Sequence, residues 1–227
     1  SNKMICYIPA RSGSKRIKNK NIKILSGKPI IIHTINQIKK LKFIKQIYVS
    51  TDSKKIKKIL SKYKIETLDL RKKELSKDKT NFIQLIRHDI DRYAKKNNTN
   101  EILFVLPTSA LVSKKSYENA YKKYINYKPE VLMSVVETNP FFAMIKKGKY
   151  LKTIFKNLVL KRTQKLKKSY IDAGSFYFFN LNNIKKYNSL KNVKKLIHHE
   201  LDFFENVDVD TPRDWEILKF KFKHKKK

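Results

Sequence analysis

The sequence is poor in several residue types, and each shortage excludes a class of protein. A single cysteine among 227 residues rules out a disulfide framework and any zinc cluster built on cysteines. No apolar run approaches the 18 residues of a membrane-spanning helix, so we expect no membrane partner. The first residues show no signal-peptide pattern, which favours a reducing, cytoplasmic location. Because the chain has only four glycines, a glycine beside a polar motif indicates a backbone position that requires one.

Acidic residues are also scarce, because 19 Asp and Glu stand against 54 Lys and Arg, a formal net charge of +35. Such a charge suggests nucleic acid as a partner. Yet only seven of the bases are Arg, the residue that dominates strong phosphate and base contacts. The lysines are spread along the chain, and 26 Ile and 18 Asn accompany 6 Ala, a bias typical of an AT-rich genome. We therefore expect no specific nucleic-acid partner, and a basic nucleic-acid-binding protein remains the alternative of a different class.

Apolar residues make up 41% of the chain, enough for a core, and their pattern alternates strands with helices. The predicted strands cover residues 4–8, 46–50, 65–70, 101–106, 131–136, 176–179 and 196–201. The predicted helices cover residues 29–41, 53–63, 80–96, 113–127 and 212–221. This order indicates βαβ units and a parallel sheet. Ligands of such sheets bind beyond the carboxyl ends of the strands, so the loops at 10–26, 50–53, 107–112 and 137–140 should share one face.

The stretch from about 138 to 168 breaks this alternation. It holds little clear helix and contains Lys147-Gly148-Lys149, which is typical of a hairpin turn. We interpret it as an inserted arm. The prediction is one domain over residues 4–220 that carries this arm, followed by a frayed basic tail at 221–227.

Three segments carry candidate chemistry. The first, Ile8–Asn21, follows the first strand. It offers small residues, a glycine and the cations Arg11, Lys15, Arg16 and Lys20, which suits a polyphosphate. It is neither a G-x-G-x-x-G nor a Walker A motif, so a dinucleotide-binding or P-loop function has no support. An ordinary basic surface loop is the alternative.

The second segment is Asn206–Trp215. Asp208 and Asp210 alternate on a predicted extended strand, so both side chains should face one side and could share a hard cation such as Mg²⁺. Thr211 and Pro212 then begin a helix as N-cap and first residue. A strand-to-helix turn with two solvated acids is the alternative.

The third segment is Arg162–Tyr177, in which Asp172 and Gly174 sit at the mouth of an aromatic strand. A glycine there implies a positive φ or a close backbone approach. The alternative is an ordinary turn that enters a strand.

Taken in order, these motifs resemble the acylneuraminate cytidylyltransferases, which activate nine-carbon α-keto sugar acids as CMP conjugates. The resemblance covers residues 4–220 and rests on I-P-A-R-x-G-S-K-R-x-x-x-K-N (Ile8–Asn21), V-S-T-D (Val49–Asp52), L-R-x-x-E-L (Leu70–Leu75), P-T-S (Pro107–Ser109), D-A-G-x-F-Y (Asp172–Tyr177) and D-V-D-T-P-x-D-W (Asp208–Trp215). R-T-Q-x-L at Arg162–Leu166 together with D-A-G-x-F-Y is most similar to the pseudaminic acid branch.

The resemblance implies a Rossmann-like, glycosyltransferase-A-like nucleotidyltransferase fold with three α/β/α layers and a small dimerisation arm. It implies Mg²⁺ on Asp208 and Asp210, and Lys20 and Arg11 in catalysis. It assigns substrate binding to Ala10, Ser14, Lys15, Asn21, Arg71, Asp78, Thr80, Thr108, Ser109, Arg162, Gln164, Asp172, Ala173 and Gly174. The implied partners are CTP, a nine-carbon sugar acid and a second copy of the chain, because the family's arm forms a homodimer contact.

Three departures bear on the substrate. The sialic acid branch carries Gln before P-T-S and often Pro after it, where this chain has Leu106 and Ala110. An Arg of that branch also has no match, because Ile171 occupies its place. Sialic acid is therefore in doubt, and a sialic or legionaminic acid enzyme is the second hypothesis. A degenerate, inactive relative is a third, against which the joint presence of Arg11, Lys20, Asp208 and Asp210 argues.

Overall fold

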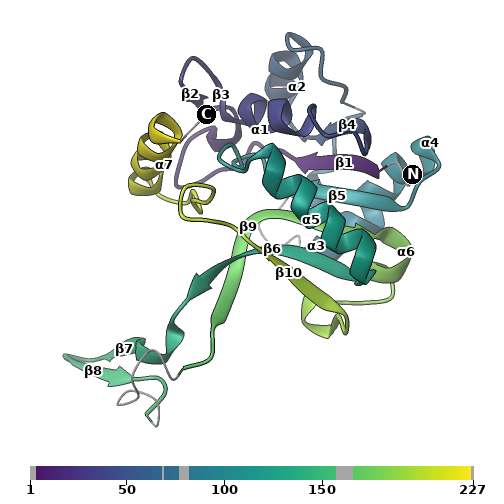
Figure 1. The fold of residues 1–227 in the computed structure, drawn as a ribbon. Helices are drawn as coiled ribbons and strands as arrows, with labels where there is room; N and C mark the ends of the chain where they lie inside the picture. Colours follow the sequence, from purple (N-terminus) through teal and green to yellow (C-terminus); the bar gives the residue numbers. More distant parts are fainter. Residues whose placement is uncertain (1–3, 68, 77–81, 157–165, 226–227) are drawn as a thin grey trace.

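A six-stranded sheet forms the centre of the protein (Figure 1). The structure is a computed structural model that describes residues 4–67, 69–76, 82–156 and 166–225. The strand order is β10-β6-β9-β5-β1-β4. The strands are β1 (Met4–Pro9), β4 (Ile44–Ser50), β5 (Glu101–Val105), β6 (Val131–Thr138), β9 (Ser169–Asn180) and β10 (Leu196–Glu200). β1 is parallel to β4 and β5, β10 is parallel to β6, and β9 is antiparallel to β5 and β6. The mostly parallel sheet confirms the predicted fold class.

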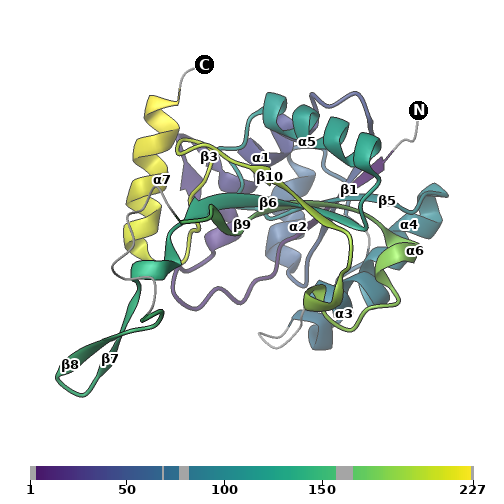
Figure 2. The same ribbon diagram turned by 60° about the horizontal axis from the view of Figure 1, so that its bottom comes forward.

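Helices cover both faces of this sheet, which gives three layers (Figure 2). One face packs against α1 (Ile30–Ile38), α2 (Lys54–Ser61) and α5 (Lys114–Tyr127). The other packs against α3 (Phe82–Leu85), a π-helical turn (Ile86–Ile90), α4 (Asp91–Asn97) and α6 (Leu181–Ile184). Strand β1 divides its side chains accordingly: Cys6 and Ile8 join the first core, and Ile5 and Tyr7 join the second. Because successive side chains of a strand point to opposite faces, the single buried strand β1 contributes to both cores.

A third, smaller cluster joins the segments that carry the sequence motifs. In this cluster the last helix, α7 (Pro212–His224), contributes Trp215 and Leu218. They pack with Ile17 of the basic loop (residues 10–26) and with Val209 of the acidic segment (Val207–Asp210). The cluster also includes Leu25 of a small hairpin formed by β2 (Ile24–Leu25) and β3 (Lys28–Pro29). Apolar burial therefore holds the basic and acidic segments against each other, although they lie far apart in the sequence.

The inserted arm projects from the body of the molecule (Figures 1 and 2). Its hairpin consists of β7 (Met144–Lys147) and β8 (Tyr150–Thr153), and Gly148 adopts a φ of +62° at the predicted turn. A short 3₁₀ turn (Pro140–Phe142) leads into it, and the paired ends of β6 and β9 form its base. Residues 157–165 of the expected arm lie outside the described residues.

Three sequence predictions about elements are wrong. Residues 65–67 and 69–70 form no strand; Ile65 is buried and Val49 N–H reaches the Glu66 carbonyl oxygen (3.4 Å), so the segment lies beside β4 without a full ladder. Asp208 and Asp210 lie in an extended loop instead of a strand. Helix α7 continues to His224, so residues 221–224 of the tail that was predicted to be frayed are helical, and Lys221 is buried there.

Candidate functional site

The loop that follows β1 is tied down at both ends. Asp52, just beyond β4, accepts hydrogen bonds from the Ser12 backbone N–H (2.8 Å) and the Ser12 hydroxyl (3.1 Å). At the far end, the Asn21 side-chain amide donates to the carbonyl oxygen of Arg11 (3.0 Å). These ties hold the cationic side chains of the loop at the carboxyl edge of the sheet, where the parallel topology predicted a ligand site.

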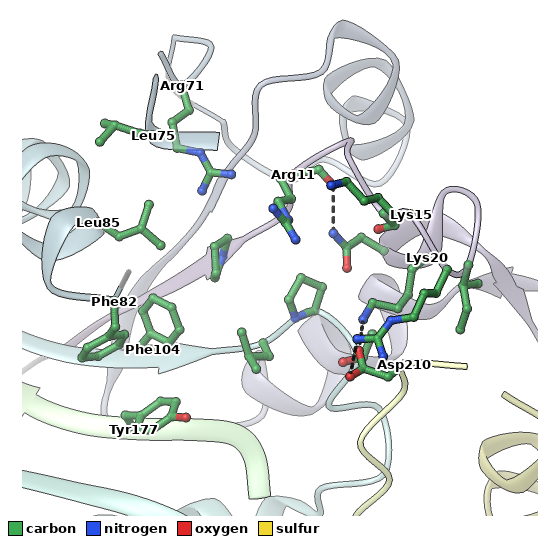
Figure 3. Close-up of a pocket in the computed structure, with 18 residues that line it drawn as sticks. Arg11, Lys15, Lys20, Arg71, Leu75, Phe82, Leu85, Phe104, Tyr177 and Asp210 are labelled. Atoms are coloured by element: carbon green, nitrogen blue, oxygen red, sulfur yellow. Dashed lines mark hydrogen bonds and ion pairs between the residues drawn. The ribbon is translucent and has the colours of Figure 1, made fainter. Parts of the chain in front are cut away.

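The loop forms one wall of a cleft of about 650 Å³ (Figure 3). Figure 3 shows Lys15, Lys20 and Asp210 on one side of this cleft, Phe82 and Leu85 on the other, and Arg11 between them. The cationic end is lined by Arg11, Lys15, Arg16 and Lys20. The opposite end is lined by Leu75, Phe82, Leu85 and Phe104, together with Arg71. The cleft thus offers cations to phosphate groups and an apolar wall to a ring system.

The core beneath the cleft contains a buried carboxylate, Asp89, beside Tyr7. Asp89 is 2% exposed, accepts hydrogen bonds from the hydroxyls of Tyr7 and Ser50, and forms an ion pair with Arg92 (2.9 Å). Burial and the charge of Asp89 raise the pKa of Tyr7 well above its usual range, while the charge of Arg71 opposes this rise. The charge of Arg71 therefore acts on the buried Tyr7 hydroxyl. Sequence analysis missed Asp89; its signal is an acid on the core-facing side of an amphipathic helix.

The acidic segment reaches the cationic end of the cleft. Arg16 forms an ion pair with Oδ2 of Asp210 (2.8 Å), and the Lys20 amine lies 3.3 Å from Oδ1 of the same carboxylate. The Lys20 amine also donates to the carbonyl oxygen of Val209 (2.6 Å). Val209 is buried between Asp208 and Asp210, so the two acids flank it on the side away from the core. Asp210 lines the cleft and Asp208 does not, so the common side of the two carboxylates stays a prediction.

The start of α7 fixes the position of this segment. Thr211 is the N-cap, and its hydroxyl oxygen accepts a hydrogen bond from the Asp214 N–H (3.3 Å). The Asp214 carboxylate in turn accepts from the backbone N–H groups of Asp210 (3.0 Å) and Thr211 (2.7 Å). The hydroxyl of Thr211 and these N–H groups lower the pKa of Asp214. The capping box confirms the predicted helix start and holds Asp210 at the cleft.

Asp208 and Asp210 fit a hard divalent cation. Burial raises the pKa of Asp208, and the negative charge of Asp210 raises it further, so a cation between them would relieve a real repulsion. The described residues contain no group of three or more His, Cys, Asp or Glu that could hold a metal ion. The remaining ligands would therefore be phosphate oxygens and water, which Mg²⁺ readily accepts.

The D-A-G segment lies in an irregularity of β9. Met133 pairs with Tyr177 and Val135 pairs with Asp172, so on the β6 side residues 173–176 lie opposite a single residue, Ser134. Gly174 has a φ of +61°, which fits the glycine expected there. The carboxylate of Asp172 accepts hydrogen bonds from the Gly174 N–H (2.8 Å) and from the Tyr177 hydroxyl. The bulge thereby connects Asp172 to Tyr177, which lines the cleft.

The cleft gathers many, but not all, of the predicted site residues. Those that line it are Arg11, Ser14, Lys15, Lys20, Asn21, Arg71, Thr108 and Asp210. Those that do not line it are Ala10, Ser109, Asp172, Ala173, Gly174 and Asp208. Ala10 and Ser109 are buried next to it, and the Ser109 hydroxyl donates to the Ser175 carbonyl oxygen (3.0 Å). Asp78, Thr80, Arg162 and Gln164 lie outside the described residues.

Sequence analysis missed part of the cleft. Arg16 was noted in the basic loop but was not assigned to the site, because no local pattern reveals a partner 194 residues away. The apolar wall was missed as well, since Phe82, Leu85 and Phe104 read as ordinary core residues. The aromatic strand pattern at 176–179 was the only available signal for Tyr177.

A sequence model described as cytidylyltransferase matches residues 5–220 of this chain. The chain belongs to the cytidylyltransferase family. Pseudaminic acid cytidylyltransferase of Campylobacter jejuni is 32% identical over 183 residues, 78% of each chain. CMP-N,N'-diacetyllegionaminic acid synthase of Legionella pneumophila is 27% identical over 222 residues, 95% of this chain and 94% of that one. The resemblance read from the motifs is thereby confirmed.

The solved structure of another cytidylyltransferase confirms the fold. CMP:2-keto-3-deoxy-manno-octonic acid synthetase complexed with CTP superposes with a TM-score of 0.73 at 13% identity, and the match covers 99% of this chain and 100% of that one. Within the described residues, no helix combines the length and the apolarity that crossing a bilayer demands.

Proposed function

We propose that this cytidylyltransferase transfers CMP from CTP to the anomeric hydroxyl of a nine-carbon α-keto sugar acid, with pseudaminic acid as the first candidate. The observation that carries the proposal is the polarised cleft, in which cations of the basic loop face Asp210 at one end and Arg71 stands beside an apolar wall at the other. The similarity to a pseudaminic acid cytidylyltransferase and the D-A-G-x-F-Y motif support the choice of sugar.

In this proposal the triphosphate occupies the cationic end. Arg11, Lys15 and Lys20 line it. A triphosphate carries several negative charges on its oxygens, so several cations are needed to balance them. Asn21 holds the Arg11 carbonyl oxygen, so it orients the loop as well as bordering the nucleotide. The cytosine would lie at the other end, where Arg71 offers donors to its polar edge and Phe82 and Phe104 offer apolar surface to its ring.

Asp208 and Asp210 would hold Mg²⁺ together with phosphate oxygens of the nucleotide. The bound ion would supply charge stabilisation at the α-phosphate and help to orient the attacking group. The protein side of the site is then the pair of carboxylates, positioned by buried Val209 and by the capping box of α7. The cations of the loop balance the charge of the remaining phosphates.

The reaction we propose is an in-line displacement. The sugar hydroxyl oxygen bonds to the α-phosphorus, the bond from that phosphorus to the bridging oxygen breaks, and pyrophosphate leaves while the hydroxyl proton is released. Arg11 and Lys20 stabilise the charge that develops on the leaving pyrophosphate. The sugar acid would be bound from the side of Asp172, Ala173 and Gly174, with Arg162 and Gln164 as further contacts proposed from the motif.

The arm supports a homodimer in this proposal. Its hairpin exposes large apolar side chains, of which Met144, Ile145, Tyr150 and Leu151 are each more than half exposed. Apolar side chains grouped on a projecting hairpin are typical of a surface that a partner covers. We propose that a second copy covers it, and that the enzyme works in the cytoplasm, where the CTP it consumes is found.

The test is pyrophosphate release from CTP with Mg²⁺ and a panel of sugar acids. We expect release with pseudaminic acid and little with sialic acid, because the residues around P-T-S and Ile171 depart from the sialic acid pattern. Faster release with legionaminic acid would favour the second candidate, to which the Legionella relative points. Release with none of these acids would refute the proposed acceptor class, and UTP or ATP in place of CTP serves as the nucleotide control.

A further inference from the structure

Arg16 is bound to the same carboxylate that we propose as a metal ligand. Its guanidinium lies 2.8 Å from Oδ2 of Asp210, while the Lys20 amine lies 3.3 Å from Oδ1. Both oxygens of Asp210 therefore face a cation. Two positive charges at these distances oppose the approach of a divalent cation and compete for the same lone pairs.

The two cations are held differently. The Lys20 side chain is only 25% exposed, and its amine also donates to the Val209 carbonyl oxygen (2.6 Å), so its position is fixed. The Arg16 side chain is 65% exposed and lies on the loop that lines the cleft. An ion pair with so much solvent contact is weak, so Arg16 can leave Asp210 at little cost. A triphosphate in the cleft would present a stronger, multiply charged acceptor to the same guanidinium.

We propose that Arg16 weakens cation binding at Asp210 before the nucleotide binds, and that it frees this carboxylate when its guanidinium transfers to the phosphates of the incoming nucleotide. The inference rests on the proposed metal site at Asp208 and Asp210. It assigns Arg16 two roles of opposite sign, because the residue opposes the metal before nucleotide binding and assists the nucleotide itself. A divalent cation would thus enter with the nucleotide or after it.

The first measurement is the affinity of the intact, nucleotide-free protein for Mn²⁺ by electron paramagnetic resonance. Arg16→Ala should bind Mn²⁺ about two- to fivefold more tightly than the wild type, the size expected for the loss of a solvent-exposed ion pair. Lys18→Ala is the matched control, because Lys18 is exposed in the same loop and the variant loses the same charge. Arg16→Lys keeps the charge and should stay close to the wild type.

The second measurement is CTP affinity in the presence of EDTA. Arg16→Ala should bind CTP several-fold more weakly than either the wild type or Lys18→Ala, although it binds Mn²⁺ more tightly. A general loosening of the loop would shift both affinities in one direction. Equal Mn²⁺ affinities of Arg16→Ala and Lys18→Ala would overturn the inference.

A third arm separates this inference from the proposed function. With CTP present and protein in excess, Asp208→Asn should lose Mn²⁺ binding. If it binds Mn²⁺ as the wild type does, the metal site is misplaced and the inference falls with it. If Asp208→Asn loses the ion but Arg16→Ala behaves as Lys18→Ala, the metal site stands and only the role of Arg16 is refuted.

Discussion

The hydroxyl of Tyr177, which lines the cleft, donates a hydrogen bond to the carboxylate of Asp172. Burial and the charge of Asp172 raise the pKa of Tyr177 far above its usual range, so the phenol stays protonated and remains a donor at any working pH. The two side chains lie on either side of the irregular stretch at 173–176. Both oxygens of this carboxylate are therefore held, which fixes its orientation.

Tyr177→Phe removes the phenol donor and leaves the Gly174 N–H as the remaining partner of Asp172. We expect the KM for the sugar acid to rise about tenfold, since a hydrogen bond to a charged group contributes roughly 1.5–3 kcal/mol. The KM for CTP should change much less, because the variant keeps the ring that packs against Phe82 and Phe104 and leaves the cationic end untouched. Steady-state kinetics with each substrate varied separately measure both values. Tyr127→Phe, at an exposed tyrosine, is the control, and an equal rise in both KM values would contradict the assignment.

Asp208→Asn and Asp210→Asn each remove one proposed ligand charge. We expect kcat to fall on the order of 100-fold in either variant, with a shift of the Mg²⁺ dependence to higher concentration. Glu216→Gln, at an exposed acid of α7, controls for the loss of one negative charge near the site. Near-wild-type rates at ordinary Mg²⁺ concentrations in either Asp variant would remove the metal assignment.

Glu130 makes acid stability testable. Its carboxylate binds the Lys186 amine (2.6 Å), the Tyr187 hydroxyl and the N–H groups of Lys194 and Lys195. These partners, Lys186 foremost, lower the pKa of Glu130 from 4.5 to about 2. Because the folded-state pKa lies below the unfolded one, the stabilisation is complete above about pH 4.5 and is lost as the pH falls toward 2.

Glu130→Gln should therefore lower the free energy of unfolding at pH 7, and its difference from the wild type should shrink between pH 4.5 and pH 2. Urea denaturation at a series of pH values measures this difference. Glu118→Gln, at a helix-surface acid with a single lysine contact, is the control. A difference that does not change with pH would show that the carboxylate charge is not what Glu130 contributes.

The arm tests the homodimer. Leu151→Glu or Ile145→Glu places a charge on a side chain that is 67% or 54% exposed, so neither should unfold the body of the protein. If a second copy covers the hairpin, burying that charge is costly and the dimer should dissociate at micromolar concentration. Light scattering coupled to size exclusion gives the mass. Lys115→Glu, at an exposed lysine of α5 outside the arm, is the control, and a wild type that is monomeric at these concentrations would contradict the proposal.

The elements that sequence analysis predicted well depend on short-range patterns. The alternation from Ile5 to Ile8 places β1 between two cores, and the Thr211–Pro212 pair marks the start of α7, because both signals are complete within a few residues. The Lys147-Gly148-Lys149 turn is of the same kind. Each of these predictions needed no knowledge of the rest of the chain.

What sequence analysis missed depends on partners distant in the chain. The alternation from Ile65 to Leu70 looks like a strand, yet a strand also needs a ladder partner. Among the described residues of this segment, the backbone hydrogen bond with β4 is the one from Val49 N–H to the Glu66 carbonyl oxygen. The ion pair of Arg16 with Asp210 requires two loops to meet, and the apolar wall of the cleft requires α3 to pack beside β5. Local sequence propensity carries no information about such long-range contacts. The order of the family motifs indicates only indirectly that their segments lie close together.

Lys221 gives the last turn of α7 a consequence for any shortened version of this protein. Its amine donates to the carbonyl oxygens of Phe203 and Asn206, immediately before the acidic segment, and the Lys225 amine donates to the carbonyl oxygen of Leu111. A chain cut at residue 220, where the family match ends, would lose both amines at once. Three backbone carbonyls would then face the cut surface without these donors, and the segment that carries Asp208 would lose its anchor on the side away from the cleft. The lysines at the end of α7 therefore anchor the segment before Asp208, and a version of the protein shortened for crystallisation would position the site less rigidly.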